Sequence, residues 1–140
     1  ICRFYNVYGD YMIYEGDYAT VIAIFEKQLR EGKPLTITGD GEQRRDFTHV
    51  DDIVDALIKI KRAMWGEVDM RYAGEIFELG RGENFSINEV ADMFGGEKKY
   101  IDARPGEYPT TLCDTSEAEK VLDWKPIKNL KDYIIEVVNG

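Results

Sequence analysis

The chain has 140 residues, of which 44% are apolar and 32% are charged, and its formal net charge is −9 at pH 7. This length and composition predict one globular domain with a modest core, and they argue against disorder. The negative charge disfavours nucleic acid and anionic lipid as partners, and no apolar run approaches the roughly 18 residues that cross a bilayer.

The first segment predicts a strand followed by a helix. Residues 1–8 are rich in aromatic side chains and alternate loosely, as strands do. Residues 20–30 carry apolar side chains at helical spacing, and Gly32 and Pro34 end that helix.

The next segment predicts a β-hairpin that leads into a helix. Residues 35–38 read as a short strand, the Asp-Gly pair at 40–41 favours a tight reversal, and 45–50 returns as the second strand. Asp51 or Asp52 is expected to cap the helix that follows, whose apolar stripe repeats at helical spacing.

The second half alternates short strands with helices that carry their own start signals. Ser86 with Glu89 three residues later predicts a capping box. The strand at 75–79, like the first strand, has no obvious neighbour, so we expect more sheet beside both. The expected elements are a strand at 75–79, a helix from Ser86 to Phe94, a strand at 98–103, a helix from Thr115 or Ser116 to Leu122, and a last helix at 130–138.

The cysteines and the histidine indicate no metal centre. Cys2 and Cys113 are far apart, no Cys-x-x-Cys pair occurs, and His49 is the only histidine. The usual structural zinc spacings are therefore missing, and we expect no metal ligands. Two reduced thiols are typical of a cytoplasmic protein, which is the location that we expect.

Three segments carry a family resemblance. They read RFYNVYG at 3–9, GKPLTITGDGEQRRDFTHVDD at 32–52, and RPGE at 104–107 followed by DTS at 114–116 and LDWKP at 122–126. In this order and spacing they resemble the extended short-chain dehydrogenase/reductase family, the group of UDP-glucose 4-epimerase and other NAD-dependent nucleotide-sugar epimerases and dehydratases.

The resemblance implies an α/β fold, namely the C-terminal part of an NAD(P)-binding Rossmann-type extended reductase with a small mixed α/β substrate-binding domain. We expect residues 1–140 to be this substrate-binding portion, with the N-terminal NAD-binding portion absent. The family's catalytic Tyr-x-x-x-Lys and its glycine-rich pyrophosphate turn do not occur in the sequence. We therefore expect no catalytic residue in this chain and no turnover by the chain alone.

Four polar residues are candidates for holding a nucleotide-sugar. Guanidinium groups pair with phosphate oxygens through two parallel hydrogen bonds, and the resemblance implies that Arg45 and Arg104 grip the pyrophosphate. It also implies that Glu107 accepts hydrogen bonds from the ribose hydroxyls and that Asn6 contacts the diphosphate or the sugar. The alternatives are surface ion pairs for the arginines, a solvated loop acid, and an asparagine that holds its own turn.

Three further residues carry expectations about the base and the cofactor. The family usually has an aromatic residue at the position of Thr38, where it stacks on the base. Threonine cannot stack, so base recognition is expected to be weaker or different at this substrate-binding position. The resemblance places Phe4 and Tyr5 beside the nicotinamide of NAD, with core packing as the alternative.

The remaining polar candidates favour structural roles. His49 precedes an aspartate at a strand-to-helix junction, which favours structure over catalysis. Asp46, Asp51 and Asp52 could form a carboxylate pair or a metal site, but the neighbouring arginines and the helix start favour ion pairing and capping.

The implied activity is NAD-dependent epimerisation or dehydration through a keto-sugar. Alternatives are a nucleotide-sugar-binding module without turnover and a structural protein that has lost the ligand. The expected partners are a nucleotide-sugar and a second copy of the chain, because missing Rossmann strands would leave apolar surface exposed. The interpretation requires that Arg45 and Arg104 face one shared cleft.

Overall fold

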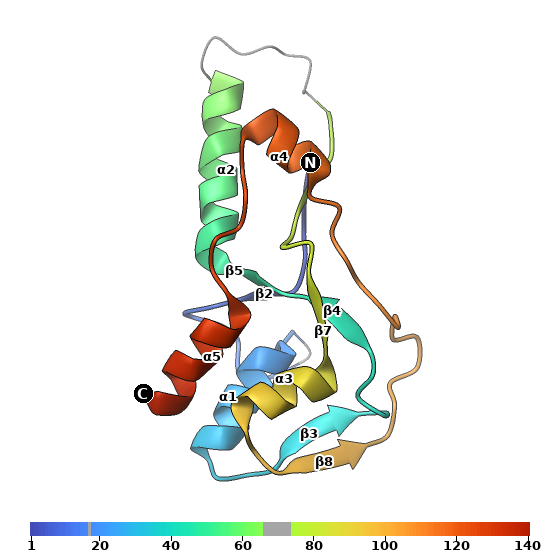
Figure 1. The fold of residues 1–140 in the computed structure, drawn as a ribbon. Coiled ribbons are helices and arrows are strands. Elements are labelled where there is room, and N and C mark those ends of the chain that lie inside the picture. Colours follow the sequence, from blue (N-terminus) through green and yellow to red (C-terminus); the bar gives the residue numbers. More distant parts are fainter. Residues whose placement is uncertain (17, 66–73) are drawn as a thin grey trace.

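The computed structural model describes residues 1–16, 18–65 and 74–140 and has the expected mixed α/β composition (Figure 1). Helices and short strands alternate along most of the chain. They are β1 (Cys2–Phe4), β2 (Val7–Tyr8), α1 (Val21–Arg30), β3 (Leu35–Thr38), β4 (Arg44–Asp46), β5 (Thr48–His49), α2 (Val50–Trp65), β6 (Phe77–Leu79), β7 (Asn84–Ser86), α3 (Ile87–Phe94), β8 (Lys98–Ile101), α4 (Ser116–Leu122) and α5 (Leu130–Asn139).

The strands pair across long stretches of sequence. β1 pairs in parallel with β6, β2 with β5 and β3 with β8, while β4 runs antiparallel to β7. The two strands for which the sequence offered no neighbour, β1 and β6, are thus partners of one another.

The predicted hairpin is wrong. The chain does reverse after β3, where the Asp40 carboxylate accepts a hydrogen bond from the Glu42 N–H at 3.0 Å. The returning strand β4 nevertheless pairs with β7, which the sequence did not reveal, and β3 pairs with β8. The Asp-Gly pair determines the local turn, but it does not determine which strand β4 pairs with after that turn.

The apolar side chains form two cores. One lies where α1, α3, α5 and β3 meet, and it includes Phe25, Ile37 and Phe94. The other lies between α2, α4 and β6 at the opposite end of the molecule, and it includes Leu79 and Trp124 (Figure 1).

The predicted start signal of α3 is confirmed, whereas Thr115 at the start of α4 forms no capping hydrogen bond through its side chain. The Ser86–Glu89 capping box is present at α3, and the Thr20 side chain caps α1. The prediction that Asp51 or Asp52 caps α2 is wrong, because the helix begins at Val50 and both residues lie in its first turn. The Asp52 carboxylate instead accepts two backbone N–H groups of the segment that leads into α5, each at 3.0 Å.

Several large apolar side chains are exposed on two parts of the molecule. These side chains lie along α2 and along the edge formed by β1 and the residue before β6. They are Ile1, Phe4, Val54, Leu57, Ile58 and Ile76. Within the described residues, no helix combines the length and apolar character that a bilayer crossing demands. The same residues contain no group of three or more metal-ligating side chains placed to hold an ion.

Candidate functional site

A cavity of about 290 Å³ contains five of the seven residues that the sequence singled out as binding groups. It lies among α1, β3, β4 and the segments that follow β1 and β8. Its lining comprises Asn6, Tyr18, Ala19, Thr20, Val21, Ile24, Thr36, Thr38, Gln43, Arg45, Phe47, Ile87, Ile101, Arg104 and Glu107. Arg45 and Arg104 therefore share one cavity, as the interpretation requires.

Parallel pairing of β3 with β8 explains how Arg104 reaches the cavity. The register sets Thr38 opposite Ile101, and the Gly39 N–H donates to the Ile101 carbonyl at 2.9 Å. The carboxyl ends of both strands therefore lie at one edge, where ligands of α/β sheets bind. Arg104 follows β8 directly, and a turn there brings Glu107 back, with its N–H donating to the Arg104 carbonyl at 3.4 Å.

The side chain of Arg45 points to the opposite face of β4 from the side chains of Arg44 and Asp46, because successive strand side chains alternate. Its Nη2 lies 3.0 Å from Glu107 Oε1, and its Nη1 donates to the Arg44 carbonyl at 2.8 Å. Arg44 points elsewhere and pairs with Glu89 of α3 at 3.0 Å. Arg104 forms no ion pair with any described residue, so the cavity keeps an uncompensated positive charge.

The start of α1 adds to this preference for anions. Thr20 and Val21 line the cavity at the N-terminus of the helix, and the first turn of α1 carries no acidic residue. The positive end of the helix dipole and the two guanidinium groups together favour a ligand with phosphate groups.

Asp46 is the buried residue that fixes this part of the site. Its carboxylate accepts hydrogen bonds from the backbone N–H groups of Arg81, Gly82 and Cys113, at 2.9, 2.8 and 3.1 Å. The predicted ion pairing or capping by Asp46 is therefore wrong. The Asp46 carbonyl accepts from Asn6 Nδ2 at 3.1 Å, and no described residue donates to Asn6 Oδ1, which is free to accept from a ligand.

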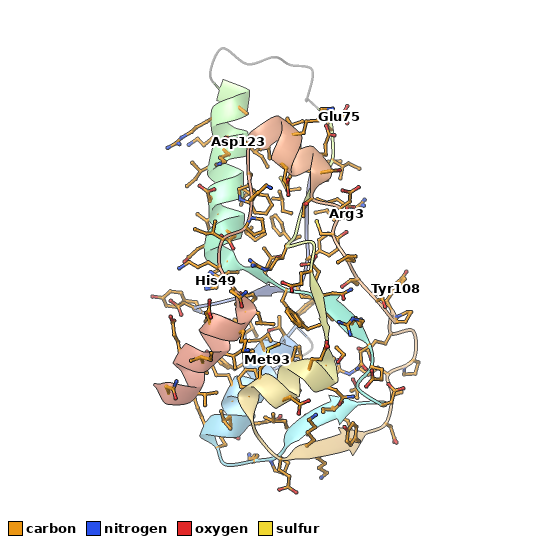
Figure 2. All side chains as sticks on the ribbon, in the orientation of Figure 1. Arg3, His49, Glu75, Met93, Tyr108 and Asp123 are labelled. Atoms are coloured by element: carbon orange, nitrogen blue, oxygen red, sulfur yellow. The ribbon has the colours of Figure 1, made fainter. Side chains whose placement is uncertain are left out.

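Asp51 and His49 have structural contacts. Asp51 lies 3.7 Å from the ammonium group of Lys128, which agrees with the predicted ion pairing. His49 is nearly buried, its Nδ1 accepts from the Asp51 N–H at 3.1 Å, and its ring contacts Tyr8 and Tyr133 edge-on. Figure 2 shows His49 where α2 begins, next to α5. His49 does not line the cavity that holds Arg45 and Arg104.

Phe4 and Tyr5 do not line the cavity. Phe4 ends β1 with 49% of its surface exposed. The Tyr5 hydroxyl donates to Glu78 Oε2 at 2.9 Å, and burial together with this carboxylate raises the pKa of Tyr5 to about 12. The same hydrogen bond, with help from Arg3, lowers the pKa of Glu78.

Sequence reasoning missed several polar and aromatic members of the lining, among them Gln43 and Tyr18. Gln43 Nε2 donates to both oxygens of Thr38, the carbonyl at 3.0 Å and the hydroxyl at 3.1 Å. Tyr18 precedes α1 in a segment without regular periodicity. Gln43 lies inside the 32–52 segment that carries the family resemblance, and that segment was the signal that could have found it. Tyr18 belongs to no strand, helix or charge pattern that would mark it.

Known proteins resemble this chain over nearly its whole length. The model of the NAD dependent epimerase/dehydratase family matches residues 1–80. A putative UDP-glucose 4-epimerase of Methanocaldococcus jannaschii is 37% identical, over 99% of this chain and 44% of the relative.

Solved structures agree with this comparison. The UDP-glucose 4-epimerase of Thermotoga maritima, solved with UDP-glucose, gives a TM-score of 0.82 at 29% identity, over 99% of this chain and 44% of that one. The UDP-glucuronic acid 4-epimerase of Bacillus cereus, solved with UDP-glucuronic acid and NAD, gives 0.78 at 28% identity, over 99% and 43%. The chain spans less than half the length of each of these proteins.

Proposed function

Because this chain belongs to the NAD-dependent epimerase/dehydratase family, we propose that residues 1–140 hold the substrate of a nucleotide-sugar epimerase or dehydratase. The observation that carries the proposal is the single cavity lined by both Arg45 and Arg104. The ligand is a nucleoside diphosphate sugar, and the ligands of the related structures make a UDP-sugar the first to test.

Each polar group in the cavity has a task that suits its chemistry. The two guanidinium groups bind the diphosphate. Glu107 neutralises only one of the two positive charges, so one remains for the negative charge of the diphosphate. Glu107 accepts hydrogen bonds from the ribose hydroxyls, and Asn6 Oδ1 accepts one from the ligand. This chain thereby holds the nucleotide remotely from the reacting sugar and aligns that sugar for reaction.

In this chain, only the carboxyl end of β1 is suited to contact the NAD that the family uses. Phe4 stands at the carboxyl end of β1 with its ring half exposed, which suits contact with a flat nicotinamide. The sequence contains no glycine-rich pyrophosphate turn and no Tyr-x-x-x-Lys. NAD, when bound to the whole protein, would supply the hydride chemistry that makes a keto-sugar. We therefore expect the 140 residues to bind the nucleotide-sugar and to show no turnover by themselves.

Isothermal titration of the chain with UDP-glucose tests the proposal. Arg104→Ala removes a guanidinium group that pairs with no described residue, so folding should be unaffected while the dissociation constant rises roughly 10- to 30-fold. Lys99→Ala, an exposed change on β8 outside the cavity, is the matched control. Absence of UDP-glucose binding, or equal affinity of the Arg104→Ala and Lys99→Ala variants, would overturn the proposal.

A second candidate function is a nucleotide-sugar-binding module without turnover, which the cavity shared by Arg45 and Arg104 would serve equally well. Epimerase assays on the protein as encoded in full separate the two, because turnover excludes the binding module. We further propose a cytoplasmic homodimer that covers the exposed apolar side chains of α2. A monomer by light scattering at micromolar concentration would contradict the dimer.

A further inference from the structure

One solvent-exposed aromatic ring lines the cavity, and the proposed function gives it no task. Among the described lining residues, the aromatic side chains are Tyr18 and Phe47. Phe47 is 2% exposed and belongs to the core, whereas Tyr18 is 86% exposed. We propose that Tyr18 is the surface on which the nucleobase of the bound nucleotide stacks, an inference that rests on the proposed function.

The backbone holds Tyr18 at the start of α1. The Ala19 N–H donates to the Gly16 carbonyl at 3.2 Å, which closes a turn around Tyr18. Thr20 then caps the helix, with its side chain accepting from the Ala23 N–H at 3.4 Å. The Tyr18 hydroxyl forms no hydrogen bond with the described residues, so the protein itself makes little use of this ring.

The order of groups in a nucleotide places the base near Tyr18. The diphosphate and the base leave the ribose on opposite sides, and Glu107 bridges the two regions by contacting Arg45 at 3.0 Å and Thr38 at 3.5 Å. With the diphosphate on the arginines and the start of α1, the base points toward β3, whose Thr36 and Thr38 line the same cavity as Tyr18. Thr36 and Thr38 share the β3 face there, because side chains two apart point the same way.

Other exposed aromatic residues are placed less well. Threonine hydroxyls and methyl groups offer no π surface, so β3 cannot stack on the base. Tyr108 follows Glu107 directly, but it is absent from the lining, and Figure 2 shows it on the outer side of the connection after β8. Tyr11 is fully exposed and also lies outside the cavity. Tyr18 is the ring that remains.

Stacking on Tyr18 supplies affinity and does not select the base. Every base has a π face, and replacing a stacking residue by alanine weakens binding by roughly 10-fold per base. Tyr18→Ala should therefore raise the dissociation constants of UDP, CDP and GDP by about 10-fold each. Inorganic pyrophosphate has no base, so its affinity should not change.

Titration calorimetry with UDP and pyrophosphate tests this, with circular dichroism to confirm folding. Tyr18→Phe keeps the ring and should bind UDP like the original chain. Tyr18→Leu keeps apolar bulk but loses the π face, and Tyr11→Ala is the control for removing an exposed tyrosine. In proton NMR, the H5 and H6 signals of bound UDP should shift upfield, and the shift should disappear in Tyr18→Ala.

The outcomes separate this inference from the proposed function. If UDP binds, Arg104→Ala weakens it and Tyr18→Ala does not, the proposed function stands and the stacking role is wrong. An equal loss of UDP and pyrophosphate affinity in Tyr18→Ala also refutes stacking, because it indicates a general disturbance of the cavity. If the unaltered chain binds neither UDP nor pyrophosphate, the proposed function and the stacking role both fail.

Discussion

Replacing Asp46 by alanine should destabilise the protein by about 4 kcal/mol, since hydrogen bonds to charged groups contribute roughly 1.5–3 kcal/mol each and are not additive. The fully buried carboxylate accepts three backbone N–H groups from two distant segments. Alanine leaves all three donors without a partner. Such a loss is a large part of the roughly 5–15 kcal/mol that stabilises an ordinary domain.

The assay is urea unfolding followed by tryptophan fluorescence. Asp46→Asn keeps the volume and one acceptor oxygen, so it should lose about half as much stability as Asp46→Ala. Asp92→Ala is the matched control, because Asp92 is 70% exposed and, among the described residues, pairs only with Lys98. Its effect should stay below about 1 kcal/mol. If Asp46→Ala destabilises the protein no more than Asp92→Ala does, the role assigned to the buried carboxylate is wrong.

Three further predictions concern a thiol, a helix cap and a core ring. Burial raises the pKa of Cys113 to about 12, so at pH 8 a thiol reagent should modify Cys2 in the native protein and both cysteines only after unfolding. The capping-box hydrogen bond lowers the pKa of Glu89 below its ordinary 4.5, so its stabilisation is complete above that value and is lost as pH falls through the lower folded pKa. Urea midpoints between pH 2 and 5 should therefore fall less steeply for Glu89→Gln. Trp124→Phe should cost about 1–3 kcal/mol by urea unfolding, because Trp124 Nε1 donates to the Asp52 carbonyl at 3.1 Å.

A specific result would contradict each of these three predictions. Rapid labelling of both thiols in the folded chain would show that Cys113 is accessible. Identical acid slopes for Glu89→Gln and the original chain would show that the cap does not contribute to acid unfolding. Unchanged stability of Trp124→Phe, compared with an exposed control such as Tyr11→Phe, would show that the buried carbonyl finds another donor.

The elements that sequence predicted well depend on neighbours a few residues away. The capping box joins Ser86 and Glu89 within one turn, and α1 and α5 have apolar stripes of their own. Strand partners depend on residues far away, which explains why the Asp-Gly signal at 40–41 led to a false hairpin. The pairing of β3 with β8 is decided by packing of the whole core.

The residues of the site also differ in whether the sequence could predict their roles. Arg45, Arg104 and Glu107 stood out because they lie in segments that resemble a family, and the structure brings them into one cavity. Asp46 stood next to arginines in sequence, so ion pairing was the natural expectation. Strand alternation turns it to the opposite face from Arg45, toward backbone donors that no sequence pattern reveals.

The long-range strand pairing has a consequence for folding kinetics. No strand of the described residues pairs with the strand that follows it in the chain. Each pair can align only after a long loop has closed, and the entropy of that closure is lost before any ladder hydrogen bond forms. Folding should therefore start from the helices and finish slowly, on the order of milliseconds to seconds rather than microseconds.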